Sequence, residues 1–195
     1  VFVRLRNEDP LIGITKQCGF MLCTHELLFR WSHRAYTIER SIPVREKNPT
    51  DEYDLFRLYN AATPSETRFA SGMTFEQWAS SREQGGGHYR EYIYEKYGIL
   101  RGWIGINQSR RVARITAMIH PEEETNIVPL MDYALSQLKG APAVYCIVQK
   151  HQAVLQRLLT QRGYEMTAEY VTLVKSMVTS TGNQEARLGV TIAPT

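Results

Sequence analysis

The segment VYCIVQKHQAVLQRLLTQRGYEMTAEYVTLVKSMV, Val144 to Val178, decides how the rest of the chain is organised. Its first residues, Val144 to Val148, are β-branched and aromatic and predict a buried strand. An amphipathic helix is expected next, and its apolar side carries Ala153, Val154, Leu155, Leu158 and Leu159. Gly163 follows where a left-handed helix cap is expected, and Glu165 to Val178 indicates a second strand, continuous or broken once. The segment therefore predicts a strand–helix–strand unit.

The chain opens with a weaker version of this unit, VFVRLRNEDPLIGITKQCGFMLCTHELLF, Val1 to Phe29. With offsets that differ by one residue, Val1-Phe2-Val3 aligns with Val144-Tyr145-Cys146, Gly19-Phe20 with Gly163-Tyr164, and Glu26 with Glu169. The first helix is poor, because Pro10 and Gly13 interrupt it. The alignment favours an internal repeat. The alternative is coincidence, because a glycine after a helix is common.

The middle of the chain begins with further expected elements. Thr37 to Arg45 alternates apolar and polar residues, which predicts a strand that could be the first strand of a new domain. Thr50 is expected to cap a helix that ends before Pro64. Thr74, with Gln77 three residues on, predicts a capping box at the start of another helix.

Three strands are expected to follow in quick succession, at His88 to Tyr97, Ile99 to Asn107 and Arg111 to His120. Their short connections, with Gly98 in the first turn, require antiparallel neighbours. A helix is expected from Thr125 to Leu138. The strand after that helix should then lie parallel to the third strand of the series.

Length and composition restrict the class of protein. The chain has 195 residues, which suits one domain or one domain with part of another. A net charge of +3 is too weak to indicate nucleic-acid binding, and no apolar run approaches a membrane span. Three cysteines and no visible signal peptide favour a reducing, cytoplasmic setting.

From Thr37 onward the expected order is strand, two helices, three antiparallel strands, helix, strand, helix and strand. This order, with the ending at Gly163-Tyr164, resembles the GNAT superfamily of acyl-CoA-dependent N-acetyltransferases over residues 37–178. The resemblance implies an α/β fold with a mixed sheet. Residues 1–36 then resemble the strand–helix–strand ending of a preceding GNAT-like copy, and residues 179–195 are expected to be a tail or linker.

The resemblance also implies a function. It implies transfer of an acetyl or other acyl group from acyl-CoA to the amine of a small molecule or peptide, with a sister GNAT-like domain as partner. In the family, a splayed strand leads into a Gln/Arg-x-x-Gly-x-Gly/Ala loop whose N–H groups hold the cofactor pyrophosphate. By position, the cofactor contacts are Ile119, His120, Thr125 and Asn126.

The segment at that position, HPEEETN from His120 to Asn126, departs from the pattern. It has no glycine and no Lys or Arg, and Glu122 to Glu124 would repel a pyrophosphate. The family's tyrosine acid is replaced by Leu159, or by Thr15 in the first copy, and a frequent asparagine is replaced by Gln152. Two interpretations stay open: an active acyltransferase, and a degenerate GNAT-like module with a structural or partner-binding role.

Glu91 and Glu95 are the candidate catalytic residues. In relatives, carboxylates on central strands deprotonate the amine through water, and strand alternation places Glu91 and Glu95 on one face. The alternative is that both carboxylates simply face solvent.

Three other residue groups are candidates for a binding site. Cys18, Cys23, His25 and His33 contain zinc-ligand residue types, but their spacing fits no compact zinc finger, and buried cysteines are the expected alternative. Arg110, Arg111 and Arg114 surround a predicted hairpin tip, which is expected to be solvated. The aromatic residues Tyr89, Tyr92, Tyr94, Tyr97 and Trp103 are expected to divide between the core and a substrate pocket.

Overall fold

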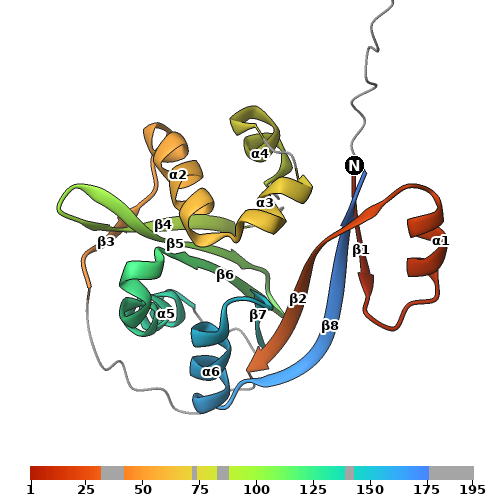
Figure 1. Ribbon diagram of the computed structural model, residues 1–195. Coiled ribbons are helices and arrows are strands. Elements are labelled where there is room, and N and C mark those ends of the chain that lie inside the picture. The colour runs from red at the N-terminus through yellow and green to blue at the C-terminus, as the bar shows by residue number, and fades with distance from the viewer. Residues whose placement is uncertain (32–41, 72–73, 83–87, 139–142, 176–195) are drawn as a thin grey trace, which may run out of the picture.

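The computed structural model describes residues 1–31, 42–71, 74–82, 88–138 and 143–175. Its strands form one sheet in the order β1-β8-β2-β7-β6-β5-β4-β3 (Figure 1). The strands are β1 (Phe2–Arg6), β2 (Met21–Trp31), β3 (Val44–Glu46), β4 (His88–Lys96), β5 (Ile99–Gln108), β6 (Ala113–Ile119), β7 (Val144–Gln149) and β8 (Glu165–Val174). The helices are α1 (Leu11–Gln17), η1 (Pro49–Asp51), α2 (Glu52–Ala62), α3 (Ser65–Ser71), α4 (Phe75–Ser81), η2 (Pro121–Asn126), α5 (Ile127–Ser136) and α6 (Ala153–Gln161).

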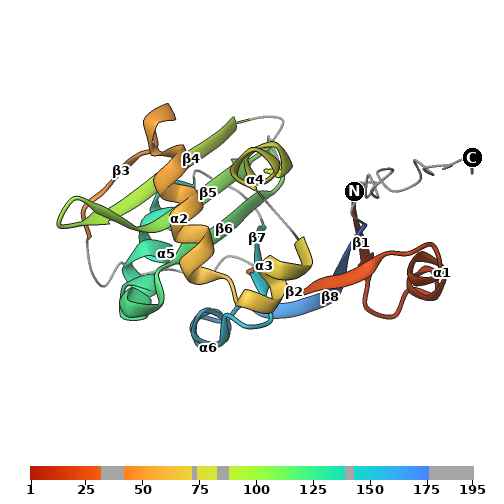
Figure 2. The ribbon, with the colours of Figure 1, turned by 45° about the horizontal axis from the view of Figure 1, so that its top comes forward.

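The helices cover the two faces of this sheet differently. Helices α2, α3 and α4 lie over one face, and α5 and α6 lie under the other (Figures 1 and 2). The α5–α6 side holds the larger core, in which Ile104, Ile115 and Leu130 are fully buried. On the other side, Leu55 and Trp78 pack on the β4–β5 region in a smaller core. On the α2–α4 side, the buried apolar cluster therefore covers β4 and β5 but does not extend across the rest of the sheet.

The antiparallel strand series is confirmed. β4 pairs with β5 and β5 with β6, both antiparallel, and Tyr97 and Gly98 form the first turn with positive φ angles of 54° and 73°. The parallel pairing of β6 with β7 is also confirmed, but it covers only Ala113–Ile115 against Val144–Cys146. Beyond Ile115 the two strands form no further ladder pairs with each other, so a gap opens between their ends.

The strand–helix–strand order expected at both ends of the chain is confirmed, and the two units exchange strands. β2 lies between β7 and β8, and β1 lies on the far side of β8. In the β2–β8 ladder, Glu26 faces Tyr170 and Leu27 faces Glu169. With the offset of 143 residues between the two units, Glu26 corresponds to Glu169 and Leu27 corresponds to Tyr170. Each pair therefore maps onto the other when the two units are exchanged, so the register is symmetric about this point. This symmetric register is consistent with the expected internal repeat, which stays a prediction.

Several expected boundaries were wrong. The strand expected at Thr37 to Arg45 begins only at Val44 among the described residues, because Pro43 lacks an N–H for a ladder; residues 37–41 lie outside the described part. The cap is Asn48 rather than Thr50: the Asn48 side chain accepts from Thr50 N at 3.0 Å and forms a capping box with Asp51. The capping box of Thr74 and Gln77 is confirmed.

The other differences concern helix and strand ends. The helix expected at Thr125 to Leu138 is α5, preceded by the 3₁₀ turn η2, and the third strand begins at Ala113 rather than Arg111. Helix α3 was not expected, because a short polar segment after Pro64 carries no apolar periodicity. The last strand ends at Val174, and the remainder of its expected range, 176–178, lies outside the described residues.

Candidate functional site

The gap between β6 and β7 is bridged by one side chain. The Gln152 Nε2 donates to the Ala117 carbonyl of β6 at 3.4 Å, and its Oε1 accepts from Gln149 N of β7 at 3.0 Å. The carboxamide thus takes the donor and acceptor roles of a peptide group in the missing ladder. Gln152, singled out in the sequence for its position, therefore closes the gap where the strands diverge.

The segment that follows β6 satisfies its own backbone. His120 is the N-cap of η2, and its Nδ1 accepts from Glu122 N at 3.3 Å. Glu123 N donates to His120 O at 2.8 Å, and Ile127 N donates to Glu124 O. These N–H groups, at the position where a phosphate cradle is expected in relatives, are therefore used within the chain.

The acidic side chains of this segment are arranged unequally. Glu123 is buried and pairs with Lys96 at 2.6 Å, and its other oxygen accepts from Asn126 Nδ2 at 2.6 Å. The hydrogen bond from Lys96 lowers the pKa of Glu123. The Glu122 side chain is 72% exposed and lies 3.2 Å from Arg101. Glu123 is therefore turned into the structure, while the negative charge of Glu122 stays at the surface.

The four residues placed at cofactor contacts have diverse surroundings. Ile119 ends β6 opposite Gly102, and Thr125 is exposed. His120 and Asn126 serve contacts within the segment, and Asn126 also donates to the Tyr94 hydroxyl at 3.3 Å. Their role in cofactor binding stays a prediction.

A cavity of about 480 Å³ lies between helices α2–α4 and the sheet. Its aromatic lining consists of Phe2, Tyr59, Trp78, Tyr89 and Trp103. Its polar lining comes mainly from the strands and includes Arg4, Glu26, Asn107, Arg114, Thr116, Gln149 and Thr172. The cavity includes residues from both sides of the β6–β7 gap, and its size is typical of a small-molecule site.

Side chains closely approach the backbone of the cavity floor at Gly105. A Cβ at Gly105 would lie 2.8 Å from both the Tyr89 hydroxyl and the Trp103 ring. Burial, followed by the nearby charge of Glu91, raises the pKa of Tyr89 to about 12. Tyr89 therefore keeps its proton at neutral pH. The expectation that the aromatic residues divide between core and pocket holds for Tyr92 and Tyr94, which are buried, and for Tyr89 and Trp103, which line the cavity. It was wrong for Tyr97, which is 93% exposed in the β4–β5 turn.

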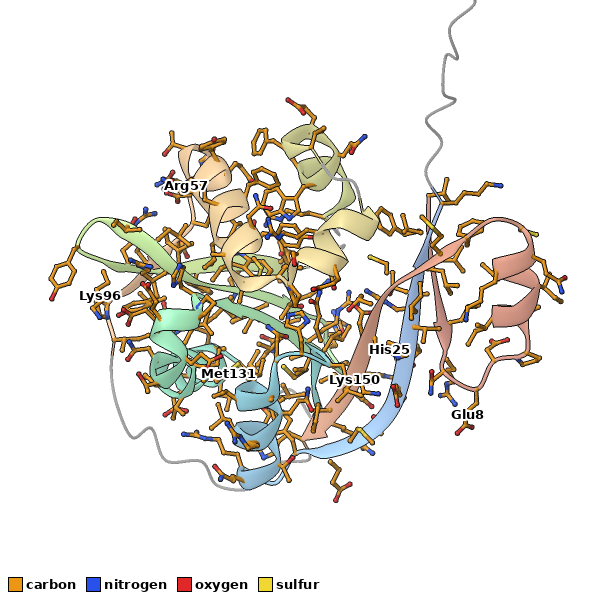
Figure 3. The ribbon with its side chains drawn as sticks, viewed as in Figure 1. Glu8, His25, Arg57, Lys96, Met131 and Lys150 are labelled. Carbon is orange, nitrogen blue, oxygen red and sulfur yellow. The ribbon has the colours of Figure 1, made fainter. Side chains whose placement is uncertain are left out.

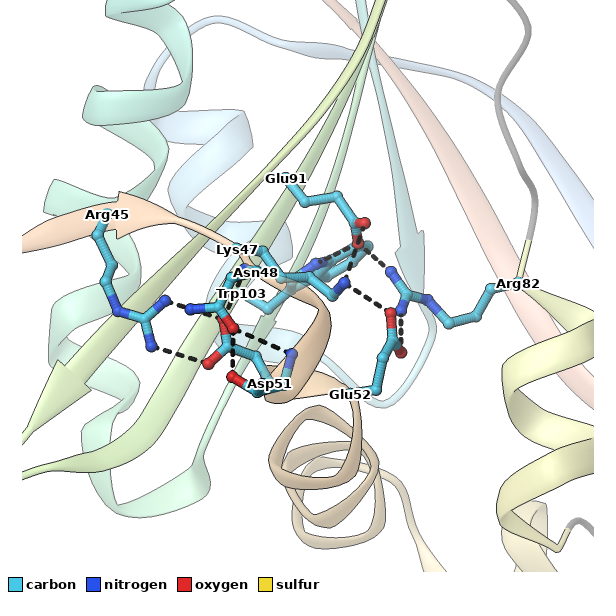
Figure 4. A network of polar contacts seen from close by, with 9 residues as sticks. Arg45, Lys47, Asn48, Asp51, Glu52, Arg82, Glu91 and Trp103 are labelled. Carbon is cyan, nitrogen blue, oxygen red and sulfur yellow. Dashed lines mark hydrogen bonds and ion pairs between the residues drawn. The ribbon is translucent and has the colours of Figure 1, made fainter.

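Glu91 belongs to a ring of four charges behind this aromatic lining (Figure 4). Lys47 Nζ lies 2.6 Å from Glu52 and 3.6 Å from Glu91, and Arg82 binds both of these carboxylates. Trp103 Nε1 also donates to Glu91 at 2.9 Å. Burial raises the pKa of Glu52, but Lys47 and Arg82 outweigh this, so the pKa is lowered overall. Glu91 is therefore held by two cations.

Arg82 connects this ring to the cavity. Its guanidinium lies 5.2 Å from the centroid of the Trp78 ring and 5.6 Å from that of Trp103, and its side chain is 17% exposed. The stacking and ion pairs fix the end of α4 against β4 and β5. Arg82 and Lys47 were not expected as site residues, because both lie outside helices and strands and their pairing with Glu52 and Glu91 follows no local sequence pattern.

Glu95 occupies a second, separate network. Arg45 Nη2 lies 2.6 Å from Glu95 and 2.8 Å from Asp51. The Arg45 hydrogen bond lowers the pKa of Asp51. The register shift in the β4–β5 ladder leaves Arg101 of β5 without a partner in β4, so β4 itself alternates regularly and Glu91 and Glu95 lie on the same face of the strand. The two candidate catalytic carboxylates are thus paired with different cations, and a catalytic role for either stays a prediction.

Comparison with solved structures gives the fold a name. The chain matches a protein from Enterococcus faecalis V583 described as a probable N-acyltransferase, with a TM-score of 0.62 and 11% identity over 88% of this chain. It also matches GCN5-related N-acetyltransferases from Anabaena variabilis (TM-score 0.58, 11% identity, 88% of this chain) and Sphaerobacter thermophilus (TM-score 0.51, 16% identity, 89% of this chain). The chain has the GNAT fold.

The extent of these matches differs between the proteins. The chain spans 44% of the Enterococcus protein, 45% of the Anabaena protein and 59% of the Sphaerobacter protein. No protein-family model matches the sequence, and no curated protein matches it either. At these identities the likeness concerns the GNAT fold alone.

The remaining sequence candidates do not converge on a site. Among the described residues no group of three or more His, Cys, Asp and Glu side chains is placed to hold a metal, and His33 lies outside them. Leu159, at the position of the family's tyrosine, is 1% exposed in the GNAT core, and Thr15 lies on α1. Of the three hairpin arginines, Arg114 lines the cavity and Arg110 and Arg111 are exposed.

In the part of the chain that the structure describes, no helix is long and apolar enough to cross a membrane.

Proposed function

We propose that this chain is a GNAT-like module that holds no acyl-CoA of its own and works beside a sister GNAT-like body. The observation that carries this proposal is the start of η2, the turn that leads into α5. There, the N–H groups of Glu122 and Glu123 bond within the chain, and no glycine lets a backbone approach a ligand. Relatives with the family's loop offer free donors at this position.

Electrostatics supports the same proposal. Two unit charges about 4 Å apart repel by about 1 kcal/mol in water and by more in a partly dry cleft. A pyrophosphate at this helix start would meet Glu122 and Glu124 on the surface. The bridge that Gln152 forms across the β6–β7 gap adds a second obstacle.

Acyl transfer to an amine is the second candidate function, and the cavity of about 480 Å³ favours it. This cavity lies beside the β6–β7 gap and has an aromatic lining and a polar floor, as small-molecule sites commonly do. In the module proposed above, the same cavity is a remnant of an acceptor site. Glu91 and Glu95 then act as structural residues that hold Lys47, Arg82 and Arg45 in place.

Isothermal titration calorimetry of the 195-residue chain with acetyl-CoA and with free CoA tests the proposal. We expect no saturable heat at micromolar ligand. The double variant Glu122→Gln/Glu124→Gln serves as a matched sample, because it removes surface charge while leaving the backbone unchanged; it too should not bind. Saturable binding of acetyl-CoA to the unaltered chain, competed by CoA, would refute the module and favour the enzyme.

A further inference from the structure

Helices α1 and α6 occupy equivalent places in the two strand–helix–strand units, but they are buried to different extents. Leu155 and Leu158 of α6 are 3% and 7% exposed. The residues 144 positions earlier, Leu11 and Ile14, are 50% and 57% exposed. No residue of α1 is buried. The same apolar helix positions are therefore covered in one unit and open in the other.

The strands show the same difference. Cys146 and Val148 of β7 are fully buried, whereas Val3 and Leu5, their counterparts 143 positions earlier in β1, are only partly buried. β7 pairs with β2 on one side and β6 on the other, and its side chains share a core with α5. Figures 1 and 2 both show α1 at the end of the sheet, away from α2–α5.

β1 also presents an open backbone edge. Within the described residues its ladder partner is β8. At the two ends of this ladder, Val1 bonds to Lys175 and Asn7 N donates to Glu169 O, each at 2.9 Å. Because such bonds alternate along an antiparallel pair, the N–H and C=O groups of Phe2, Arg4 and Arg6 face outward. A strand edge of this kind is a template for pairing with another strand.

The symmetry of the two units indicates what fits this surface. The counterpart of β1 is β7, which receives β6 as a parallel neighbour, with α5 in the same core as α6. We propose that β1 and α1 form the docking surface for a sister GNAT-like body, which adds a strand equivalent to β6 beside β1 and a helix equivalent to α5 against Leu11 and Ile14. The inference rests on the proposed role beside a sister body, and its test does not depend on acyl-CoA.

A second copy of this chain does not satisfy the same requirement. Its own β6 already lies between β5 and β7, so it has no free strand of that type to offer. The occupant is therefore a body that lacks its own strand–helix–strand ending. Such a body would complete its fold with β1, α1 and β2 of this chain.

The test uses the double variant Leu11→Glu/Ile14→Glu and a matched control, Tyr97→Glu/Ile99→Glu. Tyr97 and Ile99 are 93% and 51% exposed at the β4–β5 hairpin, at the opposite end of the molecule from α1 (Figure 1). Both pairs of substitutions are introduced into two samples. One is the 195-residue chain by itself, and the other is the complete protein as its own cell makes it. Thermal unfolding and sedimentation velocity are measured for all samples.

In the 195-residue chain we expect both double variants to unfold at the unaltered midpoint and to sediment as monomers. In the complete protein, Leu11→Glu/Ile14→Glu should lower the midpoint by several degrees and slow sedimentation, because the sister body no longer packs against α1 and the molecule becomes less compact, whereas the control should change neither. Two results would overturn the inference: a silent Leu11→Glu/Ile14→Glu variant in the complete protein, or a dimer of the 195-residue chain that this variant dissolves. Both results are independent of the calorimetric test with CoA.

Discussion

The unit β1-α1-β2 and the unit β7-α6-β8 have the same order of elements but different surroundings. In each, a glycine with a positive φ angle follows the helix, Gly19 at 85° and Gly163 at 80°. The second unit packs its helix in the main core, whereas α1 has no buried residue. Local sequence is therefore sufficient to set the turn and helix, while burial depends on which other elements are present.

The helix ends illustrate this difference. Arg162, at the end of α6, pairs at 2.5 Å with Asp132 of α5, whose side chain is fully buried. The residue 144 positions earlier is Cys18, whose carbonyl accepts from Lys175 Nζ at 2.8 Å. One helix end is thus joined to a second helix by a buried ion pair, and the other is joined to the sheet by an exposed hydrogen bond.

The largest contrast is expected from this ion pair. Arg162→Met should lower the free energy of unfolding by about 3–5 kcal/mol, because it leaves the buried Asp132 carboxylate without its main cation. Cys18→Met, at the equivalent position, should change it by less than about 0.5 kcal/mol. Urea unfolding of both variants measures the two values. Equal losses in the two variants would contradict the comparison.

Truncation of the helix side chains should give the next largest contrast. Leu158→Ala should cost about 2–5 kcal/mol, because it leaves a cavity beneath α6. Ile14→Ala should cost less than about 0.5 kcal/mol in the 195-residue chain, because that side chain is 57% exposed. Chemical denaturation with matched slopes tests the pair. A large loss for Ile14→Ala would mean that α1 is covered in this chain.

These expectations depend on what could be predicted from the sequence. The helix face of Leu155 and Leu158, the cap at Gly163 and the strand series are local patterns, and they are found as expected. The exchange of strands between the two units was not foreseen, because no local pattern specifies which strand inserts beside β7. The cap at Asn48 was missed because Thr50, two residues on, has the same chemistry.

The candidate site was less predictable than the fold. Glu91 was named as a candidate because its strand was recognised, and its catalytic role stays a prediction. Its partners Lys47 and Arg82 come from irregular segments and are brought together only by tertiary packing. The departure of residues 120–126 from the family's loop was visible from composition alone. The inward turn of Glu123 toward Lys96 was not, because it depends on the position of the β4–β5 hairpin.

The two helix-capping glycines should respond alike, which sharpens the comparison. Gly19→Ala and Gly163→Ala should each cost about 1–2 kcal/mol, because an alanine Cβ is disfavoured at positive φ. Neither added Cβ would meet an atom closer than 3.8 Å, so sterics should not separate them. Thermal unfolding of the two single variants gives the comparison. A difference above about 1 kcal/mol would show that the cap depends on tertiary contacts.

The smallest expected effect concerns pH. The hydrogen bond from Lys150 lowers the pKa of Glu169, and His25 contributes to the same shift; Lys150 and His25 lie near each other in Figure 3. Since the folded pKa lies below the unfolded one, this contribution is present above the unfolded pKa and is lost as pH falls through the folded pKa. Glu169→Gln should therefore make the loss of stability between pH 6 and pH 3 slightly shallower, because the pair is partly exposed. Urea midpoints across that range measure it, and an unchanged or steeper slope would count against this assignment.

Hydrogen–deuterium exchange of the 195-residue chain compares the two units most directly, because both helices are read in one sample. The amides of α6 should exchange near the rate set by global unfolding. The amides of α1 should exchange by local opening, about 100-fold faster or more. Equal protection of α1 and α6 in the monomeric chain would contradict the claim that the first unit stands open.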